Sequence, residues 1–380
     1  MINRPHLVVL DTSHLTGLVT DWVSANCDRR RAAETFVPDL VERGWLPLLC
    51  WHQLEELLQH QDDQLVDTRL RYLRSWPLMA WIRPSDLGAG PGSVLDVLKA
   101  EVVAAYEHPD ADVFRVRELA RDGLFSFGPG IEAIPDEFLD WRVLRAALAE
   151  RQENARRTAA ISRWRAVDID HTRIADWLDK PLRAGEEAVQ VLGHLRDKLA
   201  VEIATRGDKR IVDPGGIADA FFSMIVHDGH AVAAGTGDLP PAIQFLVNAG
   251  LELDDINPAA TFGKTMDLLI FQKRLRIICE ANGLPWQKLK RTVTQDRLPA
   301  MVIQEGMRIH AHDQPERKGS DLNDISLLCL APYADSTYVD KRTLEGVRRA
   351  RGTIGIFDRL IGHVGKARNY GEIFAALTTP

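Results

Sequence analysis

Strand and helix signals alternate at the two ends of this 380-residue chain and fade between them, which restricts the folds it can adopt. Short aliphatic runs at residues 6–10, 46–50 and 79–82 are separated by segments with helical periodicity. The last part of the chain returns to this pattern, with a short strand expected at 336–339. Strands that alternate with helices form parallel sheets covered by helices. We therefore expect one α/β domain built from both chain ends.

The long middle of the chain has almost no strand pattern. A cluster of helix breakers at residues 86–93 (DLGAGPGS) marks a boundary, and the apolar residues after it recur at helical spacing. The expected division is residues 1–86 as the first part of the α/β core, 87–311 as a large all-α insertion, and 312–380 as the second part of the core. Such an insertion costs little because the termini of one domain often lie close together.

Charge and cysteine content exclude several classes of protein. The chain has 47 Lys and Arg against 54 Asp and Glu, so its formal charge of −7 argues against a protein held on nucleic acid by overall positive charge. The four cysteines are scattered, which disfavours a disulfide framework or a thiolate zinc site and fits a reducing cytoplasm. No apolar stretch is long enough for a membrane span, so a cytoplasmic protein without a membrane partner is expected.

Acidic side chains stand at the ends of the expected elements. They occur at four places: Asp11, the pair Glu55 and Glu56, the pair Asp321 and Asp324, and Asp340. Ligands of open parallel sheets bind beyond the carboxyl ends of the strands, where these residues would meet. Clustered carboxylates repel one another unless a cation neutralises them, and an all-oxygen site suits Mg²⁺ or Mn²⁺. The alternative for each residue is a helix cap or a favourable charge in a first helical turn.

Three motifs, which between them cover all four of these places, carry a family resemblance. The motifs are LDTS at 10–13, LEEL at 54–57, and the stretch LNDISLLCLAPYADSTYVDK at 322–341. In these motifs the chain resembles the PIN-domain family of metal-dependent nucleases, over about residues 1–85 and 312–380. The resemblance implies a parallel sheet flanked by helices and cleavage of RNA, or of single-stranded DNA, with Mg²⁺ or Mn²⁺.

The resemblance also implies roles for individual residues. The catalytic metal ligands would be Asp11, Glu56, Asp324 and Asp340, with Asp321 joining them or holding a metal-bound water. Thr12, Ser13, Lys341 and Arg342 would contact substrate phosphates. Periodicity places Glu55 beside the apolar face of its helix and Glu56 away from it, whereas the motif favours Glu56 as the ligand.

The expected function is therefore that of a metal-dependent endoribonuclease, in which a metal-activated water hydrolyses the phosphodiester bond. A toxin-like or defence role, a homo-oligomer and an inhibitory protein partner would fit by analogy with the family. Two alternatives stay open. One is a catalytically silent PIN-like scaffold that binds RNA or a protein, and the other is a phosphohydrolase of small phosphate esters.

Overall fold

The chain divides into two compact units. The computed structural model describes residues 4–85, 88, 90–162, 164, 170–180, 186–233, 239–310 and 316–378. The sheet-bearing unit comprises residues 1–152, 292–312 and 320–380, and the helical unit comprises 153–291 and 313–319. The boundaries expected at residues 86–87 and 311–312 lie outside the described residues.

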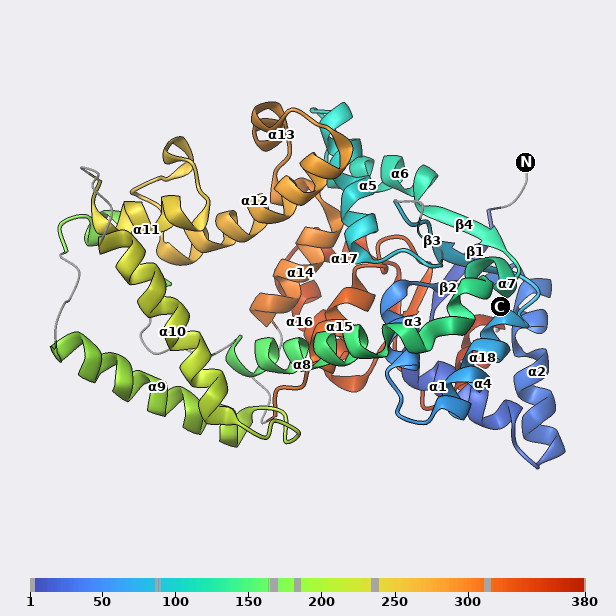
Figure 1. Cartoon of the computed structure of the whole chain (residues 1–380). Coiled ribbons are helices and arrows are strands. Elements are labelled where there is room, and N and C mark those ends of the chain that lie inside the picture. The colour runs from blue at the N-terminus through green and yellow to red at the C-terminus, as the bar shows by residue number, and fades with distance from the viewer. Residues whose placement is uncertain are drawn as a thin grey trace. The chain divides into compact units, whose positions relative to one another are not determined.

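A single six-stranded sheet forms the centre of the sheet-bearing unit, in the order β4-β3-β2-β1-β5-β6 (Figure 1). Its strands are β1 (His6–Val9), β2 (Trp45–Leu49), β3 (Met79–Ile82), β4 (Phe125–Gly128), β5 (Ser336–Tyr338) and β6 (His363–Gly365). All neighbouring pairs are parallel except β3 and β4. The expected α/β class is confirmed, with a mostly parallel sheet contributed by both ends of the chain.

Helices surround this sheet. They are α1 (Thr12–Trp22), α2 (Cys27–Glu42), α3 (Trp51–Leu58), α4 (Asp63–Arg74), α5 (Val94–Glu107), α6 (Val113–Leu124), α7 (Gly130–Ala133), η1 (Asp136–Leu144), the first part of α8 (Arg145–Ile161), η4 (Gln295–Arg297), α14 (Pro299–His310), α15 (Ser320–Leu328), α16 (Lys341–Thr353), α17 (Phe357–Leu360) and α18 (Tyr370–Thr378). Several begin directly after a parallel strand, so their first turns lie at the carboxyl edge of the sheet.

The helical unit contains helices and two isolated β-bridges among its described residues. Its further helices are η2 (Ile174–Trp177), α9 (Glu186–Arg206), α10 (Pro214–Ala233), α11 (Pro241–Ala249), η3 (Leu253–Asp255), α12 (Phe262–Asn282) and α13 (Trp286–Thr292). Separate apolar clusters centre on Leu199 and on Leu246, so this unit has cores of its own.

The expectation that residues 87–311 form an all-α insertion needs correction. β4 lies inside this range and pairs antiparallel with β3, with Ile82 opposite Phe125. The helices α5 and α6 precede it and also belong to the sheet-bearing unit. The pattern is missed because the four-residue strand FSFG follows α6 without an intervening turn signal. The sheet is therefore mixed, where the sequence predicts a purely parallel one.

Apolar side chains cover both faces of the sheet. One cluster joins Tyr338 of β5 to α1, α2, α3 and α4, and another joins Val364 of β6 to α14, α16 and α17. Val364 is the register partner of Thr337, the neighbour of Tyr338. Successive side chains of a strand point to opposite faces, so the two clusters lie on opposite sides of the sheet.

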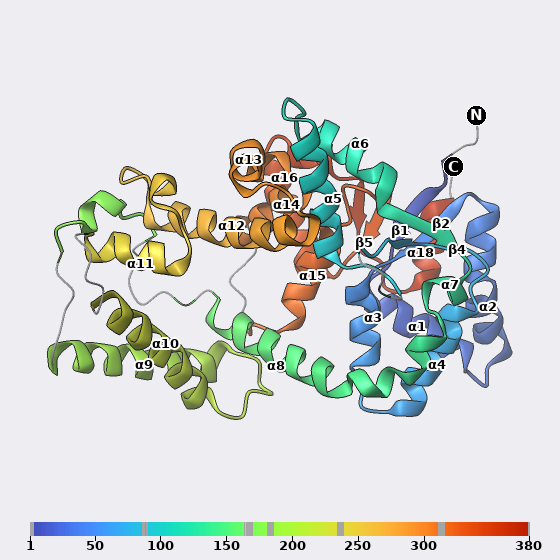
Figure 2. The same cartoon turned by 45° about the horizontal axis from the view of Figure 1, so that its top comes forward.

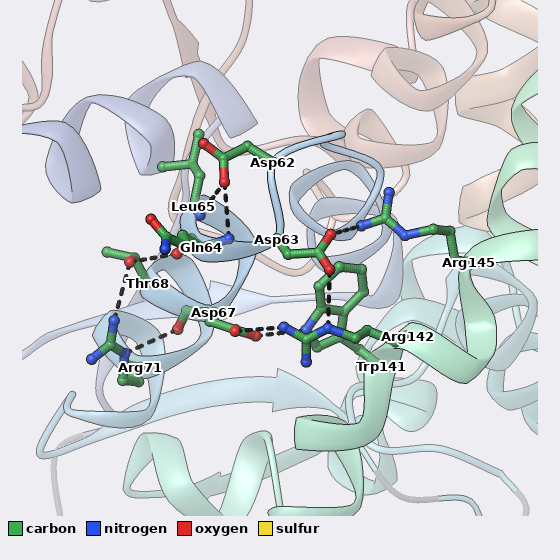
Figure 3. Close-up of polar contacts among 10 residues, drawn as sticks. All are labelled: Asp62, Asp63, Gln64, Leu65, Asp67, Thr68, Arg71, Trp141, Arg142 and Arg145. Atoms are coloured by element: carbon green, nitrogen blue, oxygen red, sulfur yellow. Dashed lines mark hydrogen bonds and ion pairs between the residues drawn. The ribbon is translucent and has the colours of Figure 1, made fainter.

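Polar and charged contacts attach η1 and the start of α8 to α4 (Figure 3). Asp63 accepts hydrogen bonds from Arg142 and Arg145, and Asp67 accepts from the indole Nε1 of Trp141 at 2.8 Å. Arg142 also donates to Asp67 at 2.7 Å. These contacts position the next turns of α8, in which Arg151 contacts α3.

No described helix is both long enough and apolar enough to cross a membrane.

Candidate functional site

The carboxyl ends of β1 and β5 each lead into an aspartate that caps the next helix. Asp11 is the N-cap of α1, and its Oδ2 accepts a hydrogen bond from the Ser13 hydroxyl at 2.9 Å. Asp340 is the N-cap of α16, and its Oδ1 accepts from the backbone N–H of Thr343 at 2.7 Å. The capping role considered for these residues is therefore present. The cap uses only Oδ1 of Asp340, and the other carboxylate oxygen accepts no hydrogen bond from the described residues.

Three of the expected ligands line one small cavity. Its free volume is about 10 Å³, and it is lined by Asp11, Thr12, His52, Gln53, Glu56, Asn323, Asp324 and Leu327. These residues come from the first turns of α1 and α3 and from the middle of α15. A volume of this size holds about one water molecule. The fold thus brings Asp11, Glu56 and Asp324 to one place, although they are far apart in the sequence.

Hydrogen bonds orient two of the elements around this cavity. The Asn323 amide donates to Glu56 Oε1 at 2.8 Å, which links α15 to α3. Gln53 is buried, and its side-chain amide donates to the Leu10 carbonyl at 2.6 Å. The Gln53 Oε1 accepts from the backbone N–H of Cys50 at 2.8 Å. The start of α3 is therefore tied to the end of β1, which sets the position of Glu56 relative to Asp11.

Glu55 and Glu56 have different surroundings. Glu56 lines the cavity, whereas Glu55 is buried and lies 3.2 Å from the guanidinium of Arg151 on α8. Burial raises the pKa of Glu55, and the charge of Arg151 opposes this shift. Periodicity leaves open whether Glu55 or Glu56 is the ligand. In the structure Glu56 lines the cavity, whereas Glu55 is paired with α8.

The charges around Asp324 change its acidity. Asp324 is half-buried, and its pKa is raised to about 8. Burial is the main cause, and the negative charges of Asp340, Asp11, Glu56 and Asp321 add to it in that order. Two like charges close together disfavour ionisation of both unless a cation lies between them. All five carboxylates predicted as ligands therefore lie close enough to interact, although Asp340 and Asp321 do not line the cavity.

The predicted phosphate-binding residues are distributed differently. Thr12 lines the cavity, while the Ser13 hydroxyl is engaged by Asp11. Arg342 lies 4.0 Å from a carboxylate oxygen of Asp321, and Lys341 lies 3.9 Å from one of Glu345. Both cations follow Asp340 at the carboxyl edge of the sheet, and both lie near carboxylates. Neither of them lines the cavity.

Three polar residues that line this cavity are not predicted from the sequence. Gln53 stands three residues after Cys50, the spacing at which a side chain reaches back to an N-cap. Asn323 precedes Asp324 within a quoted motif, but nothing in its pattern predicts a bond to Glu56. His52 also lines the cavity, and burial together with the charge of Arg151 lowers its pKa to about 4. Its imidazole is therefore neutral at pH 7.

The donor set fits Mg²⁺ or Mn²⁺ in its chemistry. Carboxylate oxygens from Asp11, Glu56 and Asp324 surround the cavity, and mutual repulsion disfavours their joint ionisation without a cation. In the described part of the chain, however, no three His, Cys, Asp or Glu side chains are grouped as ligands of one ion. Binding of an ion would therefore require these side chains to turn towards one another.

Comparison with protein-family models, with curated proteins and with solved structures gave no match to this chain. The arrangement of carboxylates is thus the basis for any functional assignment.

Proposed function

We propose that this protein is a Mg²⁺- or Mn²⁺-dependent nuclease of the PIN type that cleaves RNA. The observation that carries the proposal is the meeting of Asp11, Glu56 and Asp324 at one cavity beside the carboxyl edge of a mostly parallel sheet. RNA as the substrate class follows from the sequence resemblance at residues 10–13 and 322–341. The helical unit would then be an addition to the PIN-like core.

The residues of the cavity divide into ligands and supports. Asp11, Glu56 and Asp324 would hold the ion, and the adjacent carboxylates of Asp340 and Asp321 would attract it. Asn323 fixes one oxygen of Glu56 and leaves the other available. A hydrogen bond of this kind holds a ligand in one orientation and strengthens metal binding. The hydroxyl of Thr12, which shares the cavity, is placed to donate to a phosphate oxygen.

When bound, the ion would polarise a phosphoryl oxygen and lower the pKa of a water molecule. The chain's own contribution is to concentrate negative charge where the ion is needed and to orient the ligands. No serine, threonine or cysteine needs to act as a nucleophile in this reaction. The neutral imidazole of His52 adds a nitrogen to the cavity without adding positive charge.

The test is cleavage of a single-stranded RNA oligonucleotide in Mn²⁺ by the wild type and by Asp11→Asn and Asp324→Asn. Both variants keep the side-chain shape and replace a carboxyl group, which can ionise to bind a cation, with a neutral amide. The control is Glu34→Gln, which removes an exposed carboxylate from α2. We expect cleavage by the wild type and the control, and loss of cleavage in the two other variants.

Equal cleavage by all four proteins would overturn the metal-site assignment. Folded protein that cleaves no RNA with or without Mn²⁺ would favour the silent scaffold. Faster hydrolysis of a small phosphate ester, such as p-nitrophenyl phosphate, than of RNA would favour the phosphohydrolase. The three readings are separated by running both substrates on the same preparation.

A further inference from the structure

A second hollow of the sheet-bearing unit lies between α5 and α6. It shares no residue with the cavity lined by Asp11, Glu56 and Asp324, here called the acidic cavity. The two helices lie side by side in both views (Figures 1 and 2). The hollow, here called the α5–α6 groove, has a volume of about 320 Å³, which lies at the lower end of the range for small-molecule sites. Its floor is apolar and includes Val103, Leu119 and Leu124.

Two cations line one end of the α5–α6 groove. Arg83 follows β3 directly, and Lys99 lies one turn into α5. Arg83 donates to the Phe125 carbonyl at 2.9 Å, and Lys99 donates to the Ser85 carbonyl at 3.3 Å. These partners carry no charge. Over the part of the chain that the structure describes, neither cation forms an ion pair, and both retain further hydrogen-bond donors.

The two carboxylates that line the groove do not neutralise these cations. Asp96 accepts hydrogen bonds from the backbone N–H groups of Ser85 and Ser93, at 2.9 and 2.6 Å. The Asp96 carboxylate therefore caps the first turn of α5. Glu107 lies eight residues beyond Lys99 on the same helix, which corresponds to about 12 Å along the axis. The two cations therefore outnumber the single carboxylate at the Arg83 end of an apolar groove.

The position of Arg83 in the fold adds to this argument. It follows the carboxyl end of β3, at the same edge of the sheet as Asp11 after β1 and Cys50 after β2. Ligands of such sheets bind beyond this edge. Neighbouring strands lie about 4.8 Å apart, so β3 ends roughly 10 Å from β1. Arg83 therefore lies at the same edge of the sheet as the acidic cavity, and the groove and the cavity share no residue.

We propose that the α5–α6 groove binds a nucleotide, with Arg83 and Lys99 holding its phosphate and the apolar floor receiving its base. Guanidinium and ammonium groups form strong, charge-assisted hydrogen bonds to phosphate oxygens. Glu107 and His108, at the far end, offer polar groups to the edge of the base or the sugar. The nucleotide is either free or one unit of an RNA chain, and the second case rests on the proposed nuclease function.

The test measures binding to the full-length protein without catalysis, in EDTA. The probes are adenosine 5′-monophosphate, adenosine, inorganic phosphate and a short oligoribonucleotide, each followed by isothermal titration calorimetry. The variant is Lys99→Gln, and the matched control is Arg115→Gln, which removes an exposed cation from α6 outside the groove. We expect the monophosphate to bind the wild type and the control, and to bind Lys99→Gln about tenfold more weakly.

The comparison of probes decides the ligand. A free nucleotide that binds as tightly as the oligoribonucleotide indicates a nucleotide site in its own right, whereas much tighter binding of the oligoribonucleotide, still dependent on Lys99, indicates an RNA-binding groove. Adenosine or inorganic phosphate binding as tightly as the monophosphate would overturn the proposal, as would binding of every probe unaffected by Lys99→Gln, or no binding at all. Because EDTA removes catalysis from the measurement, failure of the nuclease assignment would leave this result unchanged.

Discussion

Asp324 and Glu101 are both carboxyl groups whose pKa is raised to about 8, mainly by burial, but only at Asp324 do neighbouring negative charges add to the shift. Glu101 on α5 is fully buried, and burial alone raises its pKa. Its oxygens accept hydrogen bonds from the Tyr333 hydroxyl at 2.8 Å and from the N–H of Ala300 at 3.0 Å. Asp324 is half-buried and is surrounded by four other carboxylates.

This difference separates a structural carboxyl group from one placed for chemistry. The partners of Glu101 already fill its acceptors and connect α5 to the start of α14, so a cation has no access and no role there. At Asp324 neighbouring negative charges add to the cost that burial imposes on ionisation, and a bound cation would remove that added cost. A raised pKa therefore indicates a functional site only when its cause can be relieved by a ligand.

The largest expected effect follows from replacing the carboxyl group on each side of this comparison with an amide. Asp324→Asn is expected to lower Mn²⁺-dependent RNA cleavage at least a hundredfold, because loss of a ligand costs more than the ten- to hundredfold typical of its supports. Glu101→Gln is expected to leave cleavage per folded molecule unchanged. Initial rates on one RNA substrate, normalised to folded protein by circular dichroism, check both. A larger loss in Glu101→Gln would contradict the distinction.

The neighbours Glu55 and Glu56 provide a second, matched pair. Glu56→Gln is expected to reduce cleavage about a hundredfold because Glu56 lines the cavity, whereas Glu55→Gln changes a residue that faces Arg151. Rates measured under the same Mn²⁺ concentration test this. Equal losses in both variants would show that the two carboxylates act together and not in separate roles.

The support of Glu56 is expected to give an intermediate effect. Asn323→Ala removes the 2.8 Å hydrogen bond to Glu56 without removing a charge. We expect about a tenfold rise in the Mn²⁺ concentration needed for half-maximal cleavage, with a smaller change in the rate at saturating Mn²⁺. Asn323→Asp serves as the comparison because it keeps the size of the side chain and adds a like charge. An unchanged Mn²⁺ dependence in Asn323→Ala would remove Asn323 from the site.

The substitution Glu101→Gln should lower the stability of the protein more than it changes its activity. In Glu101→Gln the amide can still accept from Tyr333 and Ala300, but its own N–H groups are buried without acceptors. Leaving a buried donor unpaired costs about 1–3 kcal/mol in the free energy of unfolding. Urea denaturation at pH 6 measures this cost. A variant as stable as the wild type would show that the hydrogen bonds of Glu101 contribute little to the fold.

A dependence of stability on pH is also expected. Both groups have a higher pKa in the folded protein than in the unfolded chain, so between about pH 4 and pH 8 the folded state binds more protons. The free energy of unfolding should therefore fall as pH rises through this window. Mn²⁺ is expected to reduce the part due to Asp324 and to leave the part due to Glu101. Urea denaturation at pH 5 and pH 8, with and without Mn²⁺, separates the two parts.

The sequence predicts the sheet positions well where strands are aliphatic. The runs at 6–10, 46–50 and 79–82 match β1, β2 and β3 to within one residue at each end, because aliphatic side chains buried on both faces give a clear signal. The strand expected at 336–339 also matches β5 to within one residue. β4 gives no such signal, because its four residues continue directly from α6 and one of its two phenylalanines, Phe127, is exposed.

Part of the candidate site can also be predicted from the sequence, because some of its residues directly follow strands. Asp11 and Asp340 follow strands, so topology alone places them at one edge. Their distance from the cavity depends on how each helix begins, which the pattern does not contain. Glu56 faces the cavity because Gln53 and Asn323 hold α3 in place through side-chain hydrogen bonds that cross between distant segments. Such contacts have no periodicity and become visible only in the folded structure.

The most direct test of this account is Mn²⁺ binding at pH 7, measured by isothermal titration calorimetry on the wild type, Asp324→Asn and Glu101→Gln. The account predicts that the wild type and Glu101→Gln bind Mn²⁺ with similar affinity, and that Asp324→Asn binds it at least about tenfold more weakly. Binding to Asp324→Asn with the affinity of the wild type would contradict the assignment of the acidic cavity as a metal site.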